Sequence, residues 1–102
     1  MQEMEQICFE IISNNGSAKS CYMEALAEAS EGNFNKAEEL IKEGEIWEKK
    51  GHTFHMELIS KEANGNKTEF SLILMHAEDQ LMNSQTIKIL ATEIIKLYKM
   101  MK

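Results

Sequence analysis

Hydrophobic residues along the last third of the chain recur at helical spacing. From Thr68 to Lys102 the sequence contains neither Gly nor Pro. The pattern predicts one long helix over residues 68–101, with Asn66 and Glu69 as a capping pair at its start. Its apolar positions fall on two seams that step by three and four residues: Ile87, Leu90, Ile94, Leu97 and Met101 on one, and Leu72, Met75, Asp79, Met82, Thr86 and Ile89 on the other.

The middle of the chain predicts a second long helix, over residues 34–63. Two glycines on its seam would let a neighbouring helix approach closely, at about 1 kcal/mol each in helix propensity. The following stretch, EANGNKTE (62–69), has the composition of a loop. The seam itself alternates steps of three and four and mixes large with small residues: Ala37, Leu40, Gly44, Trp47, Gly51, Phe54 and Leu58.

The first part of the chain predicts a helix over residues 3–31, in spite of an Asn-Gly pair at 15–16. Asn-Gly is a strong turn signal, but a turn would normally reset the apolar phase, and here the phase continues through it. We therefore expect one helix with a polar spot, stopped by Gly32. The positions that keep the phase are Met4, Cys8, Ile11, Asn15, Ala18, Tyr22, Ala25 and Ala29.

Three long helices and two short connections predict an all-α fold, an antiparallel three-helix up-down-up bundle. No repeat or second composition zone divides the chain, so a single domain over residues 1–102 is expected. The several apolar seams of the last helix exceed what three helices can cover by themselves. Self-association is the natural way to bury the remainder.

Charge and composition narrow the possible partners. The net charge of −6 is spread along the chain and disfavours nucleic acids and anionic membranes. No apolar run approaches the roughly 18 residues that span a bilayer, and the acidic N-terminus is unlike a signal peptide. Cys8 and Cys21 fit buried thiols better than a disulfide or a zinc site. These features predict a cytoplasmic protein without membrane insertion.

The stretch LMHAEDQLM (74–82) places ionisable side chains inside an apolar helical run. His76 lies three residues before Asp79 and four before Gln80, so all three are neighbours on the helix. Glu78 points elsewhere and could reach a histidine only on another helix or another subunit. Burying such groups without partners costs several kcal/mol. Either His76 and Asp79 share a surface hydrogen bond, or they serve catalysis or phosphoryl transfer.

Two arrangements of these residue types could hold a metal ion. Asp79 is either a solvent-facing carboxylate or, in a homotrimer, one of three that meet on the axis. Three buried carboxylates would need a cation such as Mg²⁺ or shared protons. His52 and His55, three apart on the middle helix, could bind a transition metal with Glu48 or Glu57, or they could be surface or interface residues.

Several stretches of the sequence resemble those of a known protein family. LILMHAEDQLM (72–82) resembles the signature of the lactose/cellobiose/diacetylchitobiose class of phosphotransferase-system (PTS) IIA proteins, in which a hydrophobic run precedes His-Ala-Gln-Asp-His-Leu-Met. GSAKS (16–20) and the stretch 24–44 resemble the first helix, loop and second helix of that family. TEIIKLYK (92–99) resembles its C-terminal end, so the similarity covers nearly the whole chain.

The resemblance implies a fold, a reaction and partners. It implies a homotrimeric nine-helix bundle that relays a phosphoryl group from HPr to a cysteine of the IIB component. The group then reaches a β-linked disaccharide, of the cellobiose, lactose or chitobiose class, entering through the membrane component IIC. It also implies that His76 carries the phosphoryl group on Nε2 and that Asp79 faces the trimer axis at a shared metal site, with Mg²⁺ as the candidate.

The chain departs from the family pattern in ways that leave an alternative open. Glu78 stands where Gln is usual, and Gln80 where His is usual; Glu78 beside a neighbour's His76 would repel an incoming phosphate. The alternative is a non-catalytic or regulatory trimeric paralog acting as a helical interaction protein. Without arginine, the phosphoryl oxygens would be held by backbone amides, Gln80, a lysine or partner groups. Gly16 either permits close approach of another chain or of the phosphoryl group, or is simply a weak point of its helix.

Overall fold

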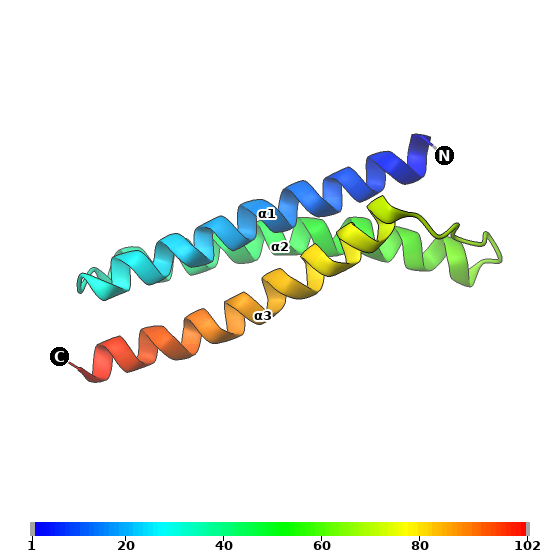
Figure 1. Cartoon of the computed structure of the whole chain (residues 1–102). Coiled ribbons are helices and arrows are strands. Elements are labelled where there is room, and N and C mark those ends of the chain that lie inside the picture. Colours follow the sequence, from blue (N-terminus) through cyan, green and yellow to red (C-terminus); the bar gives the residue numbers. More distant parts are fainter. Residues whose placement is uncertain (1, 102) are drawn as a thin grey trace.

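Three long helices make up the computed structural model, which describes residues 2–101 (Figure 1). They are α1 (Gln2–Ser30), α2 (Phe34–Ala63) and α3 (Leu72–Met100). The helices alternate in direction and form an elongated body of 54 × 21 × 17 Å. The predicted all-α up-down-up bundle is confirmed, and strands are absent from residues 2–101. The ends of the expected domain, residues 1 and 102, lie outside the described range.

The connection from α1 to α2 is built around Gly32, as predicted. Its φ of +85° lies in the left-handed region that a glycine adopts without strain. The backbone N–H of Gly32 donates to Ala29 O at 3.0 Å, and that of Asn33 donates to Glu28 O at 2.9 Å. These bonds satisfy the last carbonyl groups of α1 and turn the chain back along itself.

The predicted start of α3 is wrong. Asn66 belongs instead to the end of α2, because its N–H donates to Lys61 O at 2.9 Å after Gly65 turns with a φ of +91°. The N-cap of α3 is Ser71, in extended conformation, whose Oγ accepts the N–H of Leu74 at 3.2 Å. The helix therefore begins at Leu72 rather than at residue 68, and Glu69 takes no part in a cap.

Close contact between α1 and α2 depends on two glycines of α2, as predicted. A Cβ atom at Gly44 would lie 2.8 Å from Tyr22 Cδ1, and one at Gly51 would lie 3.1 Å from Asn15 Cγ. Either position would therefore clash with a buried side chain of α1. The small residues of the alternating seam are the points where the two helix backbones approach each other.

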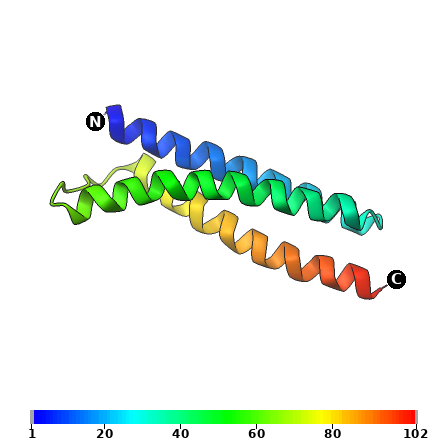
Figure 2. The ribbon, with the colours of Figure 1, turned by 180° about the vertical axis from the view of Figure 1, so that it is seen from behind.

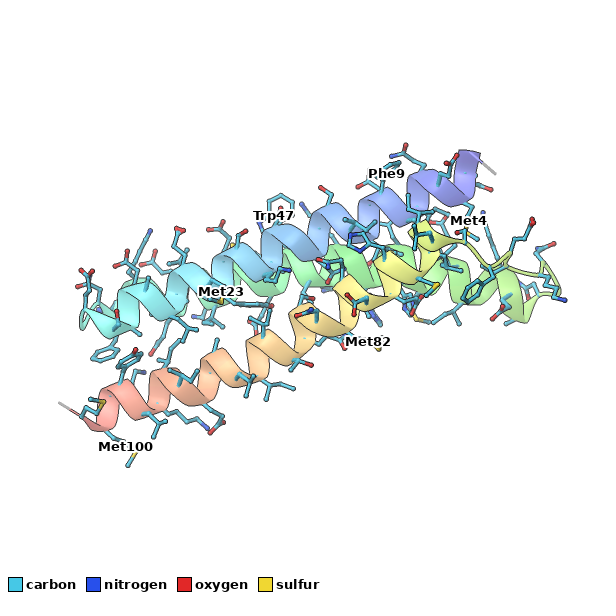
Figure 3. All side chains as sticks on the ribbon, in the orientation of Figure 1. Met4, Phe9, Met23, Trp47, Met82 and Met100 are labelled. Carbon is cyan, nitrogen blue, oxygen red and sulfur yellow. The ribbon has the colours of Figure 1, made fainter. Side chains whose placement is uncertain are left out.

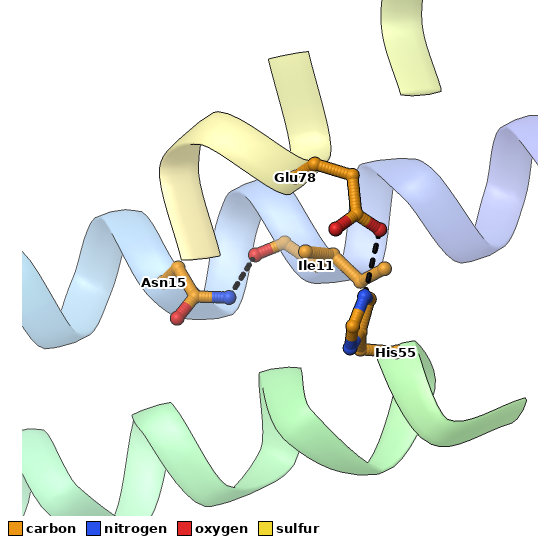
Figure 4. Close-up of polar contacts among 4 residues, drawn as sticks. All are labelled: Ile11, Asn15, His55 and Glu78. Carbon is orange, nitrogen blue, oxygen red and sulfur yellow. Dashed lines mark hydrogen bonds and ion pairs between the residues drawn. The ribbon is translucent and has the colours of Figure 1, made fainter. Parts of the chain in front are cut away.

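A polar contact crosses the middle of the bundle. The Asn15 side chain is buried, and its Nδ2 donates to Ile11 O at 2.8 Å (Figure 4). Its Oδ1 accepts a hydrogen bond from Ser84 Oγ at 2.7 Å. The Asn15 amide is thus satisfied by its own helix and by α3. This explains why α1 continues through the Asn-Gly pair that would otherwise mark a turn.

The core-facing side of α3 was not among the predicted seams. α3 lies against both other helices and spreads away from them towards its C-terminus (Figures 1 and 2). Ile95 and Tyr98 still reach α1 and α2 at that end. The residues of α3 that are buried in the bundle are Ala77, Leu81, Ser84, Ala91 and Ile95.

The two predicted seams of α3 instead leave most of their apolar side chains exposed. The side chains of Met82 and Met100 lie on α3 (Figure 3). Met82 is 55% exposed and Ile89 is 64% exposed. The expectation that three helices cannot cover the apolar surface of the last one is confirmed. We call this surface the α3 stripe; its members are Leu72, Met75, Met82, Ile89, Leu90, Ile94, Leu97 and Met100.

Two further expectations concern the membrane and the cysteines. Among residues 2–101, no helix combines the length and the apolar character that crossing a bilayer requires. Cys8 and Cys21 are free and buried, as predicted. Burial and the hydrogen bond to Glu43 raise the pKa of Cys21 to about 11, and burial also raises the pKa of Cys8. Both thiols are therefore poor nucleophiles at neutral pH.

Candidate functional site

His76 lies in the second turn of α3 and is exposed. Its neighbour Ala77 is fully buried and fixes this part of α3 against the bundle. The imidazole forms no hydrogen bond or ion pair with any of residues 2–101. A rigid backbone therefore presents an imidazole whose ring nitrogens are open to an incoming group, which is what a nucleophile for an external partner requires.

Gln80 follows His76 by one helical turn and lies on the flank of α3 that faces α1. Its Oε1 accepts a hydrogen bond from Lys19 Nζ at 3.4 Å. Lys19 itself lies one turn after Gly16 on α1. A Cβ atom at Gly16 would meet nothing within 4 Å, so the surface beside it is open. The sequence contains eleven lysines and does not indicate which of them lies near Gln80. The structure shows that it is Lys19.

Glu78 lies on the opposite flank of α3, facing α2. Its Oε2 accepts a hydrogen bond from His55 Nε2 at 2.7 Å (Figure 4). The His55 side chain is 15% exposed and that of Glu78 is 39% exposed. The sequence predicted that Glu78 could reach a histidine only on another helix or on another subunit. Within the chain, that histidine is His55 of α2.

Asp79 points away from the other two helices. It follows the buried Ala77 by two residues, which is about 200° around an α-helix. Met75 and Met82, its neighbours on the α3 stripe, are 48% and 55% exposed. Asp79 forms no ion pair with any of residues 2–101. An uncompensated carboxylate therefore stands in the middle of an apolar surface.

The described part of a single chain does not assemble a set of metal ligands. Residues 2–101 contain no group of three or more His, Cys, Asp or Glu side chains arranged to hold an ion. His55 is bonded to Glu78, and Glu48 accepts the hydroxyl hydrogen of Tyr22 at 2.6 Å. The suggested site at His52 and His55 therefore has no third ligand here. Asp79 supplies a single carboxylate, so a site built on it needs other copies of the chain.

Comparison with known proteins gives consistent matches over nearly the whole chain. The family described as "PTS system, Lactose/Cellobiose specific IIA subunit" matches residues 6–99. The lichenan-specific phosphotransferase enzyme IIA component of Bacillus subtilis is 44% identical over 98 residues, which are 96% of this chain and 89% of that protein.

Two solved structures share the fold. The PTS cellobiose-specific enzyme IIA from Bacillus anthracis superposes with a TM-score of 0.92 at 46% identity, covering 94% of this chain and 88% of that one. The IIA(Chitobiose) protein of Escherichia coli, solved in complex with HPr, gives a TM-score of 0.83 at 31% identity, covering 95% and 94%.

The fold and these matches define a IIA component of a sugar phosphotransferase system. The chain belongs to the lactose/cellobiose-specific IIA subunit family. The family resemblance drawn from the HAEDQLM motif is thereby confirmed. IIA components are phosphotransferase components, so His76, Gln80 and their surroundings are candidates for the chemistry of such a protein.

Proposed function

We propose that this protein is a cytoplasmic phosphocarrier that accepts a phosphoryl group from phospho-HPr on His76 Nε2. The observation that carries the proposal is the exposed, unpartnered imidazole on a rigid part of α3. A relative solved together with HPr supports HPr as the donor. In the first step the lone pair of Nε2 attacks phosphorus, the N–P bond to the HPr histidine breaks, and a new N–P bond forms at His76.

The second step passes the group to the IIB component. A cysteine thiolate of IIB attacks phosphorus, an S–P bond forms, and the imidazole of His76 leaves with its electron pair. Alignment of the three atoms and compensation of charge are the main requirements of such a transfer. The phosphoryl group then serves uptake of a β-linked disaccharide through IIC. Relatives named for lichenan, cellobiose and chitobiose support that sugar class, with two of the higher identities on the β-glucoside side.

The working form in this proposal is a homotrimer of nine helices. The α3 stripe runs the length of α3 and consists of exposed large apolar side chains, a surface of the kind that marks an interaction site. Packing three copies of α3 around a threefold axis would cover it with copies of itself. His76, on the flank of α3, would then lie at a boundary between subunits, where HPr and IIB could reach it.

The same axis would gather three copies of Asp79. Each carboxylate lacks a counter-ion within the described part of its own chain and is flanked by methionines. Three such groups would repel one another unless a divalent cation or shared protons compensate them. Oxygen ligands suit Mg²⁺, which would act here by holding the subunits together.

The alternative, a non-catalytic regulatory paralog, rests on Glu78 and Gln80. The bond from Glu78 to His55 favours the carrier, because it draws this carboxylate to the α2 side of α3. The deciding experiment incubates the protein with enzyme I, HPr and phosphoenolpyruvate, followed by intact-protein mass spectrometry. We expect one acid-labile phosphoryl group per subunit, none on His76→Ala, and normal labelling of His52→Ala, which also removes an exposed histidine. A folded trimer that stays unlabelled would establish the paralog.

A further inference from the structure

Lys19 contacts a neutral side-chain amide, unlike the other lysines whose contacts the structure describes. Four of these, Lys61, Lys88, Lys96 and Lys99, each pair with a carboxylate, and Lys50 lies over the ring of Trp47. Lys19 is half-buried at the boundary of α1 and α3, yet it forms no ion pair with any carboxylate of residues 2–101. Its Nζ contacts the neutral amide of Gln80 instead. A protein with a net charge of −6 thus keeps one cation uncompensated at this place.

The position of this cation relates it to His76. Gln80 is four residues from His76, and side chains at that spacing are adjacent on a helix. The hydrogen bond to Gln80 therefore holds Lys19 Nζ on the flank of α3 that carries the imidazole. At 3.4 Å this bond is long, so the ammonium group can exchange the amide oxygen for a stronger acceptor at little cost.

A phosphoryl group would be such an acceptor. It brings between one and two negative charges and several acceptor oxygens, and no arginine exists in the chain to meet them. Glu78, which could have opposed it, is bonded to His55 on the other flank. Among the charged groups described around α3, Lys19 is the cation on the flank that carries His76 and Gln80.

We propose that Lys19 binds the phosphoryl group carried by His76, its Nζ moving from Gln80 Oε1 to a phosphoryl oxygen. Once Gln80 Oε1 no longer accepts from Lys19, the amide can turn so that its Nε2–H groups donate to a second phosphoryl oxygen. Lys19 thereby shifts the equilibrium of phosphoryl exchange from phospho-HPr towards the phosphorylated form of this protein. It also favours the doubly ionised form of the phosphoryl group. This inference rests on the proposed phosphorylation of His76 and adds a residue of the same chain to that site.

The test uses the full chain in three variants. Lys19→Met removes the charge, Lys19→Arg keeps it, and Lys36→Met is the control because it removes an exposed lysine from the far end of α2. After labelling by enzyme I, HPr and phosphoenolpyruvate, two quantities are measured: the equilibrium of phosphoryl exchange with HPr, and the pH titration of the ³¹P resonance of the phosphohistidine.

We expect Lys19→Met to shift the exchange equilibrium about tenfold towards phospho-HPr, as expected for loss of one charge-assisted hydrogen bond. The ³¹P titration should move to higher pH, because an adjacent cation favours the doubly ionised phosphoryl group. Lys19→Arg should recover most of both values, and Lys36→Met should match the wild type.

The outcomes separate this inference from the function on which it rests. A wild-type protein that takes no label, or a labelled His76→Ala, would contradict the proposed function. A labelled wild type with Lys19→Met unchanged in both measurements would overturn the role of Lys19. So would a variant that only melts at a lower temperature while its ³¹P midpoint stays in place. If Lys19→Met does not fold, Lys19→Gln, which keeps a polar group facing Gln80, is measured instead.

Discussion

His55 and Glu78 connect α2 to α3 through a hydrogen bond of 2.7 Å between Nε2 and a carboxylate oxygen. This bond lies two residues from His76 in sequence but on the other flank of the helix. It gives a negative side chain of the HAEDQLM motif a partner within its own chain. The most conspicuous departure from the family motif is thus matched by a histidine on the neighbouring helix.

The His55–Glu78 bond should show a measurable coupling. In a double-mutant cycle with His55→Gln and Glu78→Gln, we expect a coupling free energy of about 0.5–1.5 kcal/mol, the range of a partly buried hydrogen bond. Urea unfolding of the four proteins measures it. Strictly additive losses would mean that the bond contributes nothing to stability.

Replacing Gly44 and Gly16 by alanine should change the free energy of unfolding in opposite directions. Gly44→Ala should lower the free energy of unfolding by about 1–3 kcal/mol, since its Cβ would clash with the buried Tyr22 ring. The added methyl group of Gly16→Ala meets nothing within 4 Å among the described residues, so this variant should gain up to about 1 kcal/mol of helix propensity. Thermal unfolding compares them.

If Gly16 serves the phosphoryl site rather than being a weak point of α1, a second difference follows. Gly16→Ala should then lose phosphoryl transfer while its melting temperature rises or stays level. Retention of both full transfer and full stability would leave Gly16 without a role at the site.

The fold should lose stability in alkali. Burial raises the pKa of Cys21 from its ordinary 9.0 to about 11, and burial with the bond to Glu48 raises the pKa of Tyr22 well above its usual range. The folded state therefore holds these protons more tightly than the unfolded chain. Their stabilisation is complete below pH 9 and is lost as pH rises towards 11 and beyond.

Denaturant titrations between pH 7 and pH 11 test this prediction. Cys21→Ala should flatten the first part of the decline, and Tyr22→Phe should reduce its later part. A free energy of unfolding that stays constant up to pH 11 would contradict the burial of these groups.

A charge placed on the α3 stripe should disrupt self-association. Ile89→Lys should dissociate the assembly in sedimentation experiments, because it inserts a cation into an apolar interface. Ile46→Lys is the matched control, since Ile46 is similarly exposed, at 59% against 64%, but lies on α2. If both variants associate like the wild type, the α3 stripe is not the interface.

Asp79→Leu should leave the assembly intact or strengthen it without added metal. The leucine removes the repulsion of three carboxylates and extends the apolar surface between Met75 and Met82. Sedimentation with and without a chelator measures the effect. Conversion of this variant to monomers would show that Asp79 does not lie on the axis.

Much of the fold follows from the sequence because α1 and α2 obey simple periodicity. The phase that runs through Asn15 predicted one continuous helix, and the seam glycines Gly44 and Gly51 predicted close approach. The core face of α3 escaped notice because Ala77, Ser84 and Ala91 are small or polar. Their large apolar neighbours produced a stronger pattern, which belongs to the outer surface.

The candidate site was predictable only in part. The motif identified His76 and Asp79, since both lie on one element and their spacing is fixed by the helix. The contacts of Lys19 with Gln80 and of His55 with Glu78 join residues 61 and 23 positions apart. Such contacts depend on the axial alignment of the helices, which hydrophobic spacing leaves undetermined.

The buried amide of Asn15 sets that alignment. It is held by Ile11 and Ser84 and fills the space left by Gly51. Sliding α3 by one turn would take Ser84 away from the buried Oδ1 of Asn15, at about 1–3 kcal/mol, and sliding α2 would move the space at Gly51 away from the same side chain. Hydrophobic packing alone would allow three apolar helices several axial offsets. The polar contacts of Asn15 favour the offset that brings Lys19 opposite Gln80.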